Sequence, residues 1–235
     1  MSIKNNSLVE IAMERIKQHI ADNHMQPGDK FLSEGELTDQ LQVSRTVIRE
    51  ALRSLGSLGI IEVRKGGGVY VSASDFESIK RILRHHYEVH GAKIKELVEI
   101  RKIIELGALR LIIEKDMDVD ADRLEDINKN YRDAISKGED TKRHDQLFHQ
   151  HIMKEADNQT FYNFADVIHD YFSLVKINLI QDTDALLKSY QEHDALISAL
   201  KDKKLAEAHR IMSEHFEPIF QFIRQMEVQT DDGSN

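Results

Sequence analysis

The chain has 235 residues, of which 40% are hydrophobic, so it can form one large domain or two smaller domains with a hydrophobic core. It contains no cysteine, which excludes disulfides and thiolate metal ligands. No apolar run approaches the roughly 20 residues that cross a bilayer, and the polar N-terminus lacks the apolar core of a signal peptide. We therefore expect a cytoplasmic protein that does not contact a membrane.

The net charge of −9 is distributed unevenly along the chain. Up to Ser72 the basic and acidic residues balance, and the rest of the chain carries the acidic excess and most of the histidines. Such an asymmetry predicts two regions with different partners. A neutral region can still bind nucleic acid if its cations gather on one face.

The first part of the chain predicts three short helices. Apolar residues recur with a period close to 3.6 over residues 8–23, and the turn at 27–29 ends that helix. Ser33 and Glu36 have the spacing of a capping box at the start of a second helix. A third helix is expected over 44–58, where the side chain of the first residue, a serine, can cap it.

Two runs of β-branched residues, 60–64 and 69–71, follow these helices and predict a β-hairpin. Its tip contains Lys65 and Gly66, so the backbone could approach DNA closely there and the lysine could contact phosphate or the minor groove. Three helices followed by a hairpin is the winged helix-turn-helix pattern, in which the third helix enters the major groove.

The third predicted helix carries a cationic face. Arg45 and Arg49 are four residues apart and can pair with guanine, Thr46 lies beside the first arginine, and Arg53 continues the stripe toward phosphate. An arginine pair of this spacing is also typical of an ordinary solvated helix face. The capping box, the tight turn and the cationic hairpin around it favour DNA binding.

Beyond the hairpin the sequence predicts only helices. The expected spans are 76–90, 94–114, 120–136, 142–156, 159–180, 184–200 and 203–228. We therefore predict a mainly α protein with a winged domain at 1–72, a linker at 73–78, an all-helical bundle of six to seven helices at 79–228, and a disordered tail at 229–235.

Four residues of the helical region are candidate metal ligands. Asp145 and His149 are four residues apart and share a helix face. His193 and His215 would have to reach the same point from two later helices, which the sequence alone does not show. Three imidazoles and a carboxylate suit Zn²⁺ or Ni²⁺ better than a cation that prefers oxygen ligands. A lone helical histidine is usually an ordinary surface or core residue, and we assign His144, His151, His169 and His209 to that class.

The N-terminal motifs closely resemble the GntR family of bacterial transcription regulators over residues 8–72. The resemblance rests on Pro27-Gly28, Leu32-Ser33-Glu34, the run from Val43 to Leu52, Gly59-Ile60-Ile61 and the run from Gly66 to Val71. It implies that Arg45, Thr46, Arg49, Lys65 and Gly66 contact DNA. The sequence departs from the family at Gly35, where many members have an arginine that can touch bases, and at Leu32, where many have a proline.

Residues 76–225 resemble FCD, the ligand-binding domain of the FadR subfamily. The motifs that carry this resemblance are Val98–Glu105, Asp145–His149, Glu192–Ile197 and Met212–Phe216. In the metal-binding branch of that domain, the ligands match Asp145, His149, His193 and His215. The arginine that pairs with an effector carboxylate matches Arg101. The branch that binds acyl-CoA lacks this set, so a fatty-acyl effector is not expected.

These features predict a homodimeric regulator that binds double-stranded operator DNA, and not an enzyme. We expect a repressor of a catabolic operon that is released by a small carboxylate effector, an organic or sugar acid, bound beside a divalent transition metal. Two alternatives remain at this stage. The metal could itself be the signal, or the cluster could belong to a metalloenzyme, with Glu192 as the candidate acid or base.

Overall fold

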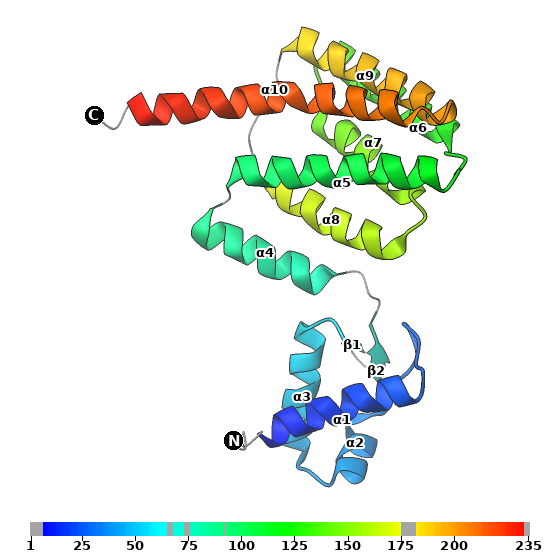
Figure 1. The fold of residues 1–235 in the computed structure, drawn as a ribbon. Helices are drawn as coiled ribbons and strands as arrows, with labels where there is room; N and C mark the ends of the chain where they lie inside the picture. The colour runs from blue at the N-terminus through cyan, green and yellow to red at the C-terminus, as the bar shows by residue number, and fades with distance from the viewer. Residues whose placement is uncertain (1–6, 65–67, 73–75, 92, 175–181, 233–235) are drawn as a thin grey trace, which may run out of the picture. The chain divides into compact units, whose positions relative to one another are not determined.

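The computed structural model describes residues 7–64, 68–72, 76–91, 93–174 and 182–232 (Figure 1). These residues form ten helices and one two-stranded antiparallel sheet, which confirms the predicted mainly α fold class. The chain divides into two compact units, Met1–Arg81 and Ile82–Asn235. None of the described helices is both long and apolar enough to cross a membrane.

The first unit has the winged helix-turn-helix order of elements. These are α1 (Leu8–Asp22), α2 (Glu34–Leu41), α3 (Arg45–Ser57), β1 (Ile61–Arg64) and β2 (Gly68–Val71). The two strands pair in antiparallel register from Ile61↔Val71 to Arg64↔Gly68. The residues at 65–67, which include the predicted contacts Lys65 and Gly66, lie outside the described part of the chain.

Local side-chain hydrogen bonds fix where these helices begin. Ser33 and Glu36 form the predicted capping box, in which each side chain accepts a hydrogen bond from the other residue's backbone N–H, at 3.3 and 2.7 Å. Ser44 caps α3 in the predicted way by accepting from the backbone N–H of Val47. Between α2 and α3, Gln42 adopts a left-handed conformation, with φ 55°, that ends α2 and allows the tight turn.

Helices are the only regular secondary structure among the described residues of the second unit. Its elements are α4 (Glu77–His90), which begins in the first unit, α5 (Ile94–Glu114), α6 (Ala121–Lys137), α7 (Lys142–Glu155), α8 (Gln159–Leu174), α9 (Thr183–Lys201) and α10 (Leu205–Asp232). The predicted spans agree with these helices to within a few residues. The end of the fifth predicted span, 175–180, lies outside the described residues.

Two predicted boundaries differ from the structure. The last two residues assigned to the linker, Glu77 and Ser78, already belong to α4. Residues 229–232, which we assigned to a disordered tail, continue α10, because neither glycine nor proline interrupts the sequence between Pro218 and Gly233.

The core of the second unit brings several helices together around α5. This helix packs against α7, α8 and α10, while α6 packs against α7 and α9. Leu109, Ile112, Phe148 and Phe216 are completely buried in the shared core. The helices that carry the four candidate ligands and Arg101 therefore share one interior.

Candidate DNA-reading helix and metal centre

The structure places the predicted DNA contacts of α3 on its exposed side. Arg45, Thr46, Arg49 and Arg53 are all exposed. The predicted core-facing residues Ile48, Ala51, Leu52 and Leu55 are buried on the opposite side of the helix. The apolar side fastens the helix to the domain, which leaves the cationic side available to a partner.

Glu34 of α2 orients one of these arginines, a contact that the sequence did not indicate. The Arg49 Nε donates a hydrogen bond of 2.8 Å to Oε2 of Glu34, and both side chains are substantially exposed. An exposed ion pair contributes little to stability. Because it engages Nε, it leaves the terminal guanidinium nitrogens, which pair with guanine, on the outer edge of the side chain.

Gly35 occupies the position where many family members carry an arginine. A Cβ built on this glycine would meet only the Ser33 Oγ, at 3.9 Å, and the glycine is not among those with positive φ. The fold therefore does not require glycine here. A side chain could therefore be accommodated at this position without a clash.

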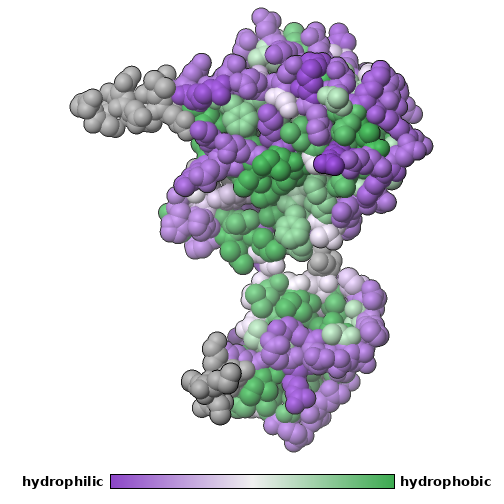
Figure 2. Space-filling view, in the orientation of Figure 1, coloured by the Kyte–Doolittle hydropathy of each residue, from purple (hydrophilic) through white to green (hydrophobic). Residues whose placement is uncertain are grey.

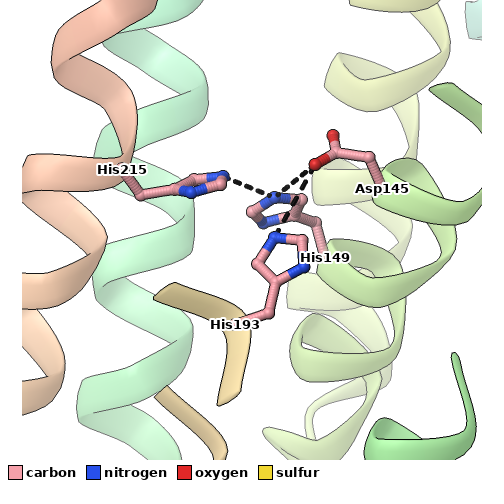
Figure 3. A group of neighbouring side chains, drawn as sticks. All are labelled: Asp145, His149, His193 and His215. Carbon is pink, nitrogen blue, oxygen red and sulfur yellow. Dashed lines mark hydrogen bonds and ion pairs between the residues drawn. The ribbon is translucent and has the colours of Figure 1, made fainter. Parts of the chain in front are cut away.

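The four candidate metal ligands converge, as Figure 3 shows. Asp145 and His149 come from α7, His193 from α9 and His215 from α10. Their ligand atoms all lie within 4.8 Å of one another. The Nε2 of His149 is 3.2 Å from Nε2 of His215 and 3.6 Å from Oδ1 of Asp145, and that oxygen is 3.7 Å from Nε2 of His193. Two atoms that each bind one ion at about 2.1 Å are roughly 3.0–3.4 Å apart, so small shifts would complete the site.

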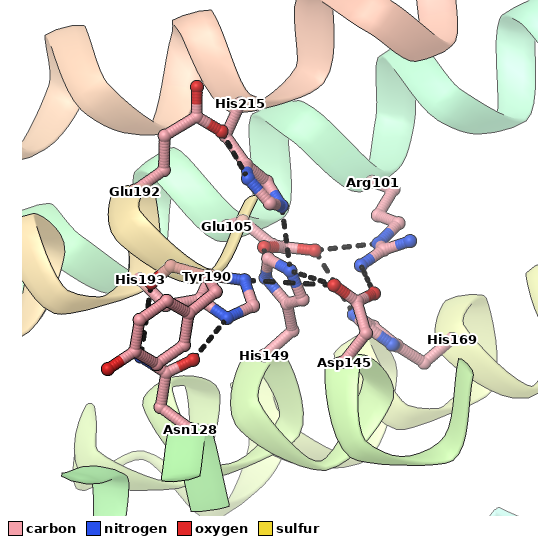
Figure 4. Close-up of polar contacts among 10 residues, drawn as sticks. All are labelled: Arg101, Glu105, Asn128, Asp145, His149, His169, Tyr190, Glu192, His193 and His215. Carbon is pink, nitrogen blue, oxygen red and sulfur yellow. Dashed lines mark hydrogen bonds and ion pairs between the residues drawn. The ribbon is translucent and has the colours of Figure 1, made fainter. Parts of the chain in front are cut away.

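The Nδ1 atom of each of the three imidazoles contacts an oxygen atom of a residue outside the four candidate ligands (Figure 4). The Nδ1 of His193 contacts the Asn128 Oδ1 at 3.1 Å, and that of His215 contacts the Glu192 Oε2 at 2.9 Å. The Nδ1 of His149 contacts the Glu105 carboxylate. With oxygen acceptors at all three Nδ1 atoms, each Nδ1 carries a proton, and each Nε2 can present a lone pair to the common centre once it is deprotonated.

Asn128 has only one orientation that satisfies its neighbours. Its Nδ2 donates to the backbone oxygen of Tyr190 at 3.1 Å and to Asp194 Oδ1 at 2.8 Å. The amide oxygen must therefore face His193. Because Asn128 is completely buried, this arrangement fixes the tautomer of the histidine.

The cluster fits a first-row transition metal ion. The Nε2 of His193 is buried and has no hydrogen-bond partner among the described residues, which is costly unless another group satisfies it. Burial, followed by the neighbouring His215 and His149, holds the pKa of His193 well below its usual range, so this ligand is neutral. A neutral imidazole is the form that binds a metal.

Neighbouring charges shift the pKa values of the two candidate ligands on α7, Asp145 and His149. Burial opposes ionisation of Asp145, but His149, His193 and Arg101 outweigh it and hold the pKa of the carboxyl below its usual range. Burial likewise opposes a charge on His149, yet Glu105 and Asp145 raise the pKa of this histidine to about 9. Metal binding at neutral pH would therefore displace a proton from His149.

Arg101 lies beside the cluster, on α5. Its Nε donates to Oε1 of Glu105 at 2.7 Å, and its Nη2 is 3.9 Å from the Asp145 Oδ2, the oxygen that faces away from the histidines. The rings of Phe172 and Phe216 lie 4.8 and 5.4 Å from the guanidinium carbon. A buried arginine held in this way is pre-positioned for a carboxylate.

A cavity of about 390 Å³ opens onto this arginine and the metal cluster. Its lining includes Arg101, Asp145 and His215 together with the hydroxyl-bearing side chains of Thr141 and Ser189. Cavities of this size hold small organic ligands, and their few polar groups fix the ligand's orientation.

Sequence reasoning missed part of this site. His169, which we assigned to the ordinary histidines, is only 2% exposed, lines the cavity and lies 3.3 Å from Glu105 Oε1. Glu105 could have been found, because it follows Arg101 by one helical turn, but nothing in the sequence marks Asn128 or His169. Glu192, our candidate acid or base, instead holds His215.

The other histidines have separate contacts. His151 pairs with Glu155 at 3.2 Å, and His209 contacts the backbone oxygen of Leu106 at 3.0 Å. His144 is partly buried and is not among the residues that make up the metal cluster.

An exposed cationic helix in a winged domain and a separate helical domain with a ligand-sized cavity define a class of protein, the ligand-responsive transcription regulators. Family models agree with both halves. Residues 8–71 match the model described as bacterial regulatory proteins, gntR family, and residues 96–218 match the FCD domain. The chain belongs to the GntR family, with a C-terminal FCD domain, and is a DNA-binding transcriptional regulator and not an enzyme.

Individual relatives are similar along most of their length. The regulator LutR of Bacillus subtilis is 27% identical, over 83% of this chain and 92% of that protein. The Uxu operon regulator of Haemophilus influenzae is 25% identical, over 93% and 82%, and the repressor NanR of Cronobacter sakazakii is 24% identical, over 93% and 86%. A solved structure, Streptococcus agalactiae GntR, has a TM-score of 0.63 and 26% identity, covering 90% of this chain and 98% of that one.

Replacement of Arg49 by alanine should weaken operator binding roughly 10- to 100-fold, because a good bidentate arginine contact contributes about 1–3 kcal/mol. Binding of the purified protein to its operator fragment, measured by fluorescence anisotropy at fixed salt, tests this. Arg210→Ala is the matched control, since it removes a similarly exposed arginine from α10. Equal loss in both variants would contradict a specific role for Arg49.

The double variant His193→Ala, His215→Ala should lose bound metal, because only two of the four ligands remain. Elemental analysis after dialysis against Zn²⁺ or Ni²⁺ should give about one ion per chain for the wild type and nearly none for the variant. His209→Ala, which alters a partly buried histidine outside the cluster, should retain the ion. Full occupancy in the double variant would show that the ion binds elsewhere.

Proposed function

We propose that the protein is a cytoplasmic homodimeric repressor of a catabolic operon. In this proposal, a small organic or sugar acid binds beside a divalent transition metal, Zn²⁺ or Ni²⁺, and releases the operator. The observation that carries the proposal is the position of Arg101, buried next to the outer oxygen of a metal ligand and open to the cavity. The relatives named as a repressor and as an operon regulator support the biological setting.

Arg101 is suited to bind one end of the acid. Its Nε is taken by Glu105, so the terminal nitrogens remain for the carboxylate. Phe172 and Phe216 restrict the guanidinium and limit its access to water. A bound ion with open coordination positions would supply positive charge for the oxygens of the same acid.

The cavity distinguishes this proposal from a regulator that senses the metal itself. A purely metal-sensing site needs only its ligands, whereas here about 390 Å³ of space adjoins them. A closed tetrahedral site would be structural, while an octahedral ion held by four protein ligands keeps two positions for an effector.

DNA binding would require two copies of the chain. Each winged domain offers one recognition helix, and a dimer reads two half-sites at a fixed spacing. A small change in how the two domains are placed would therefore reduce operator affinity. A coupling of about 1–3 kcal/mol changes affinity roughly 5- to 150-fold.

We propose that helix α4 couples effector binding in the helical domain to DNA binding by the winged domain. In the second unit, Arg84 pairs with Asp170 of α8 at 3.1 Å, and the ring of Tyr87 packs edge-on against Tyr171. The residues on either side of this α8 pair, His169 and Phe172, line the cavity. A ligand that shifts this part of α8 would therefore also shift its contacts with α4.

The beginning of α4 contacts the recognition helix. In the first unit, Ser78 Oγ donates to the backbone oxygen of Leu58 at 3.0 Å, and Arg81 Nη2 donates to that of Ser57 at 3.3 Å. Both acceptors lie at the C-terminal end of α3. The same helix thus contacts the ligand domain through its second half and the DNA-reading helix through its first turns.

An effector should raise the melting temperature of the metal-loaded protein and leave the stripped protein unchanged. Ligand that binds only the folded, loaded form stabilises it by mass action, by about 2.7 kcal/mol at 100 times Kd. A thermal-shift screen of organic and sugar acids on both forms tests this. Arg101→Ala should abolish the shift while retaining the metal. Stabilisation by metal alone, with operator affinity following metal concentration, would favour the metal-sensing alternative.

Replacement of Arg84 by alanine should uncouple the two sites. Effector affinity and operator affinity measured separately should stay within about twofold of wild type, because the Arg84–Asp170 pair touches neither ligand. The fold-change in operator affinity caused by saturating effector should shrink severalfold. Arg210→Ala again serves as the control. An unchanged effector response in Arg84→Ala would remove α4 from the proposed route.

A further inference from the structure

One buried histidine at the cavity wall lies outside the metal cluster. Figure 2 shows that hydrophilic residues cover much of the visible surface of the helical domain, where water can hydrogen-bond to them. His169 of α8 is instead only 2% exposed, and its ring lines the cavity. Its buried Nε2 makes no well-formed hydrogen bond with the described residues. Such a group at a cavity wall points to a role in ligand binding.

His169 and Arg101 contact the same oxygen atom. The Nε2 of His169 lies 3.3 Å from Oε1 of Glu105, which also accepts the hydrogen bond of 2.7 Å from Nε of Arg101. The imidazole and the guanidinium are therefore neighbours, and both line the cavity. Two ligand groups that bind these side chains must be close together in the ligand, so they belong to the same end of a small acid.

The charges around His169 determine which of its nitrogens carries the proton. Burial, and next the charge of Arg101, lowers the pKa of His169 from its usual value, so the ring is neutral at physiological pH. Burial opposes ionisation of Glu105, but His149 and Arg101 outweigh it and hold the pKa of this carboxyl well below its usual range. A neutral imidazole has one N–H and one lone pair. Because the negative oxygen of Glu105 faces Nε2, the N–H is favoured there, and Nδ1 is a hydrogen-bond acceptor.

An acceptor beside Arg101 restricts the chemistry of the ligand. The guanidinium donates to a carboxylate, whereas Nδ1 needs a donor, which an ionised carboxylate does not have. A hydroxyl on the carbon next to the carboxylate supplies this donor. A keto oxygen at the same place would bring two lone pairs together. A site that hydrogen-bonds a hydroxyl discriminates strongly against an analogue without it.

We propose that His169 is a specificity-determining residue of the effector site, which accepts a hydrogen bond from the 2-hydroxyl of a 2-hydroxy acid whose carboxylate pairs with Arg101. The inference rests on the proposed function and narrows its effector to one class of acid. The competing role for His169 is support of Glu105, which contacts the metal ligand His149. That role predicts a change in metal binding and none in the choice of acid.

Matched pairs of acids test the choice of ligand. Lactate and pyruvate, 2-hydroxyglutarate and 2-oxoglutarate, and gluconate and its 2-deoxy analogue differ within each pair in the donor next to the carboxylate. Titration calorimetry on the metal-loaded protein should show at least about tenfold tighter binding of the hydroxy acid in each pair that binds.

Binding of these acids without such a preference would overturn the inference and leave the proposed function intact. The same holds if none of the three hydroxy acids binds while a different acid stabilises the loaded protein in the thermal-shift screen. If no acid binds the loaded protein at all, the proposed function itself fails, and the inference fails with it.

Substitution of His169 tests whether this residue makes the choice. His169→Phe keeps a ring of similar size without nitrogen atoms, and should reduce the preference within a pair to about twofold or less, because the acceptor is gone. Elemental analysis should still find about one metal ion per chain, since all four ligands remain. His169→Asn, whose amide oxygen can take the place of Nδ1, should retain part of the preference.

His209→Phe is the matched control, because it alters another partly buried histidine that does not line the cavity. It should keep the full preference. Loss of metal from both His169 variants, with the preference unchanged in the protein that remains loaded, would assign His169 to support of Glu105 and overturn the inference. If His169→Phe does not fold, the matched acids and His169→Asn decide the question.

Discussion

The interior of the helical domain contains buried charged and polar side chains, and their burial is energetically unfavourable unless they have partners. Arg101, Glu105, His149 and His193 are almost completely buried, and each would be strongly destabilising alone. They are tolerated because they have polar partners: Arg101 donates to Glu105, which contacts His149, and His193 contacts Asn128. Helices α5, α7, α9 and α10 must keep their relative positions for these contacts to persist.

The same constraint explains why this interior can hold a ligand. Partners at the Nδ1 atoms of the histidines leave their Nε2 atoms directed at one point, and one of those, on His193, is left without a hydrogen bond. Replacing such buried ion pairs by an apolar core of the same volume is often neutral or stabilising, so the cluster is weak evidence of a role in stability. The stability of this region is therefore supplied mainly by the apolar residues around the cluster.

The winged domain follows a simpler rule. Its recognition helix is divided into a buried apolar side and an exposed cationic side, and its ends are set by local caps. Glu34 orients the side chain of Arg49 but contributes little to the stability of the fold, because the ion pair is exposed.

The sequence by itself determined the elements of both domains, the apolar and cationic sides of α3, and the identity of the four candidate ligands. The elements, the two sides of α3 and the Asp145–His149 pair depend on periodicity or on contacts a few residues apart, which a single chain segment encodes, whereas His193 and His215 were joined to that pair only by the family resemblance. Only the tertiary structure brought His193 and His215 to Asp145 and His149, gave Asn128, Glu105 and His169 their places, and opened the cavity at Arg101. These positions depend on how distant helices pack, and no local pattern specifies which side chains meet across a core.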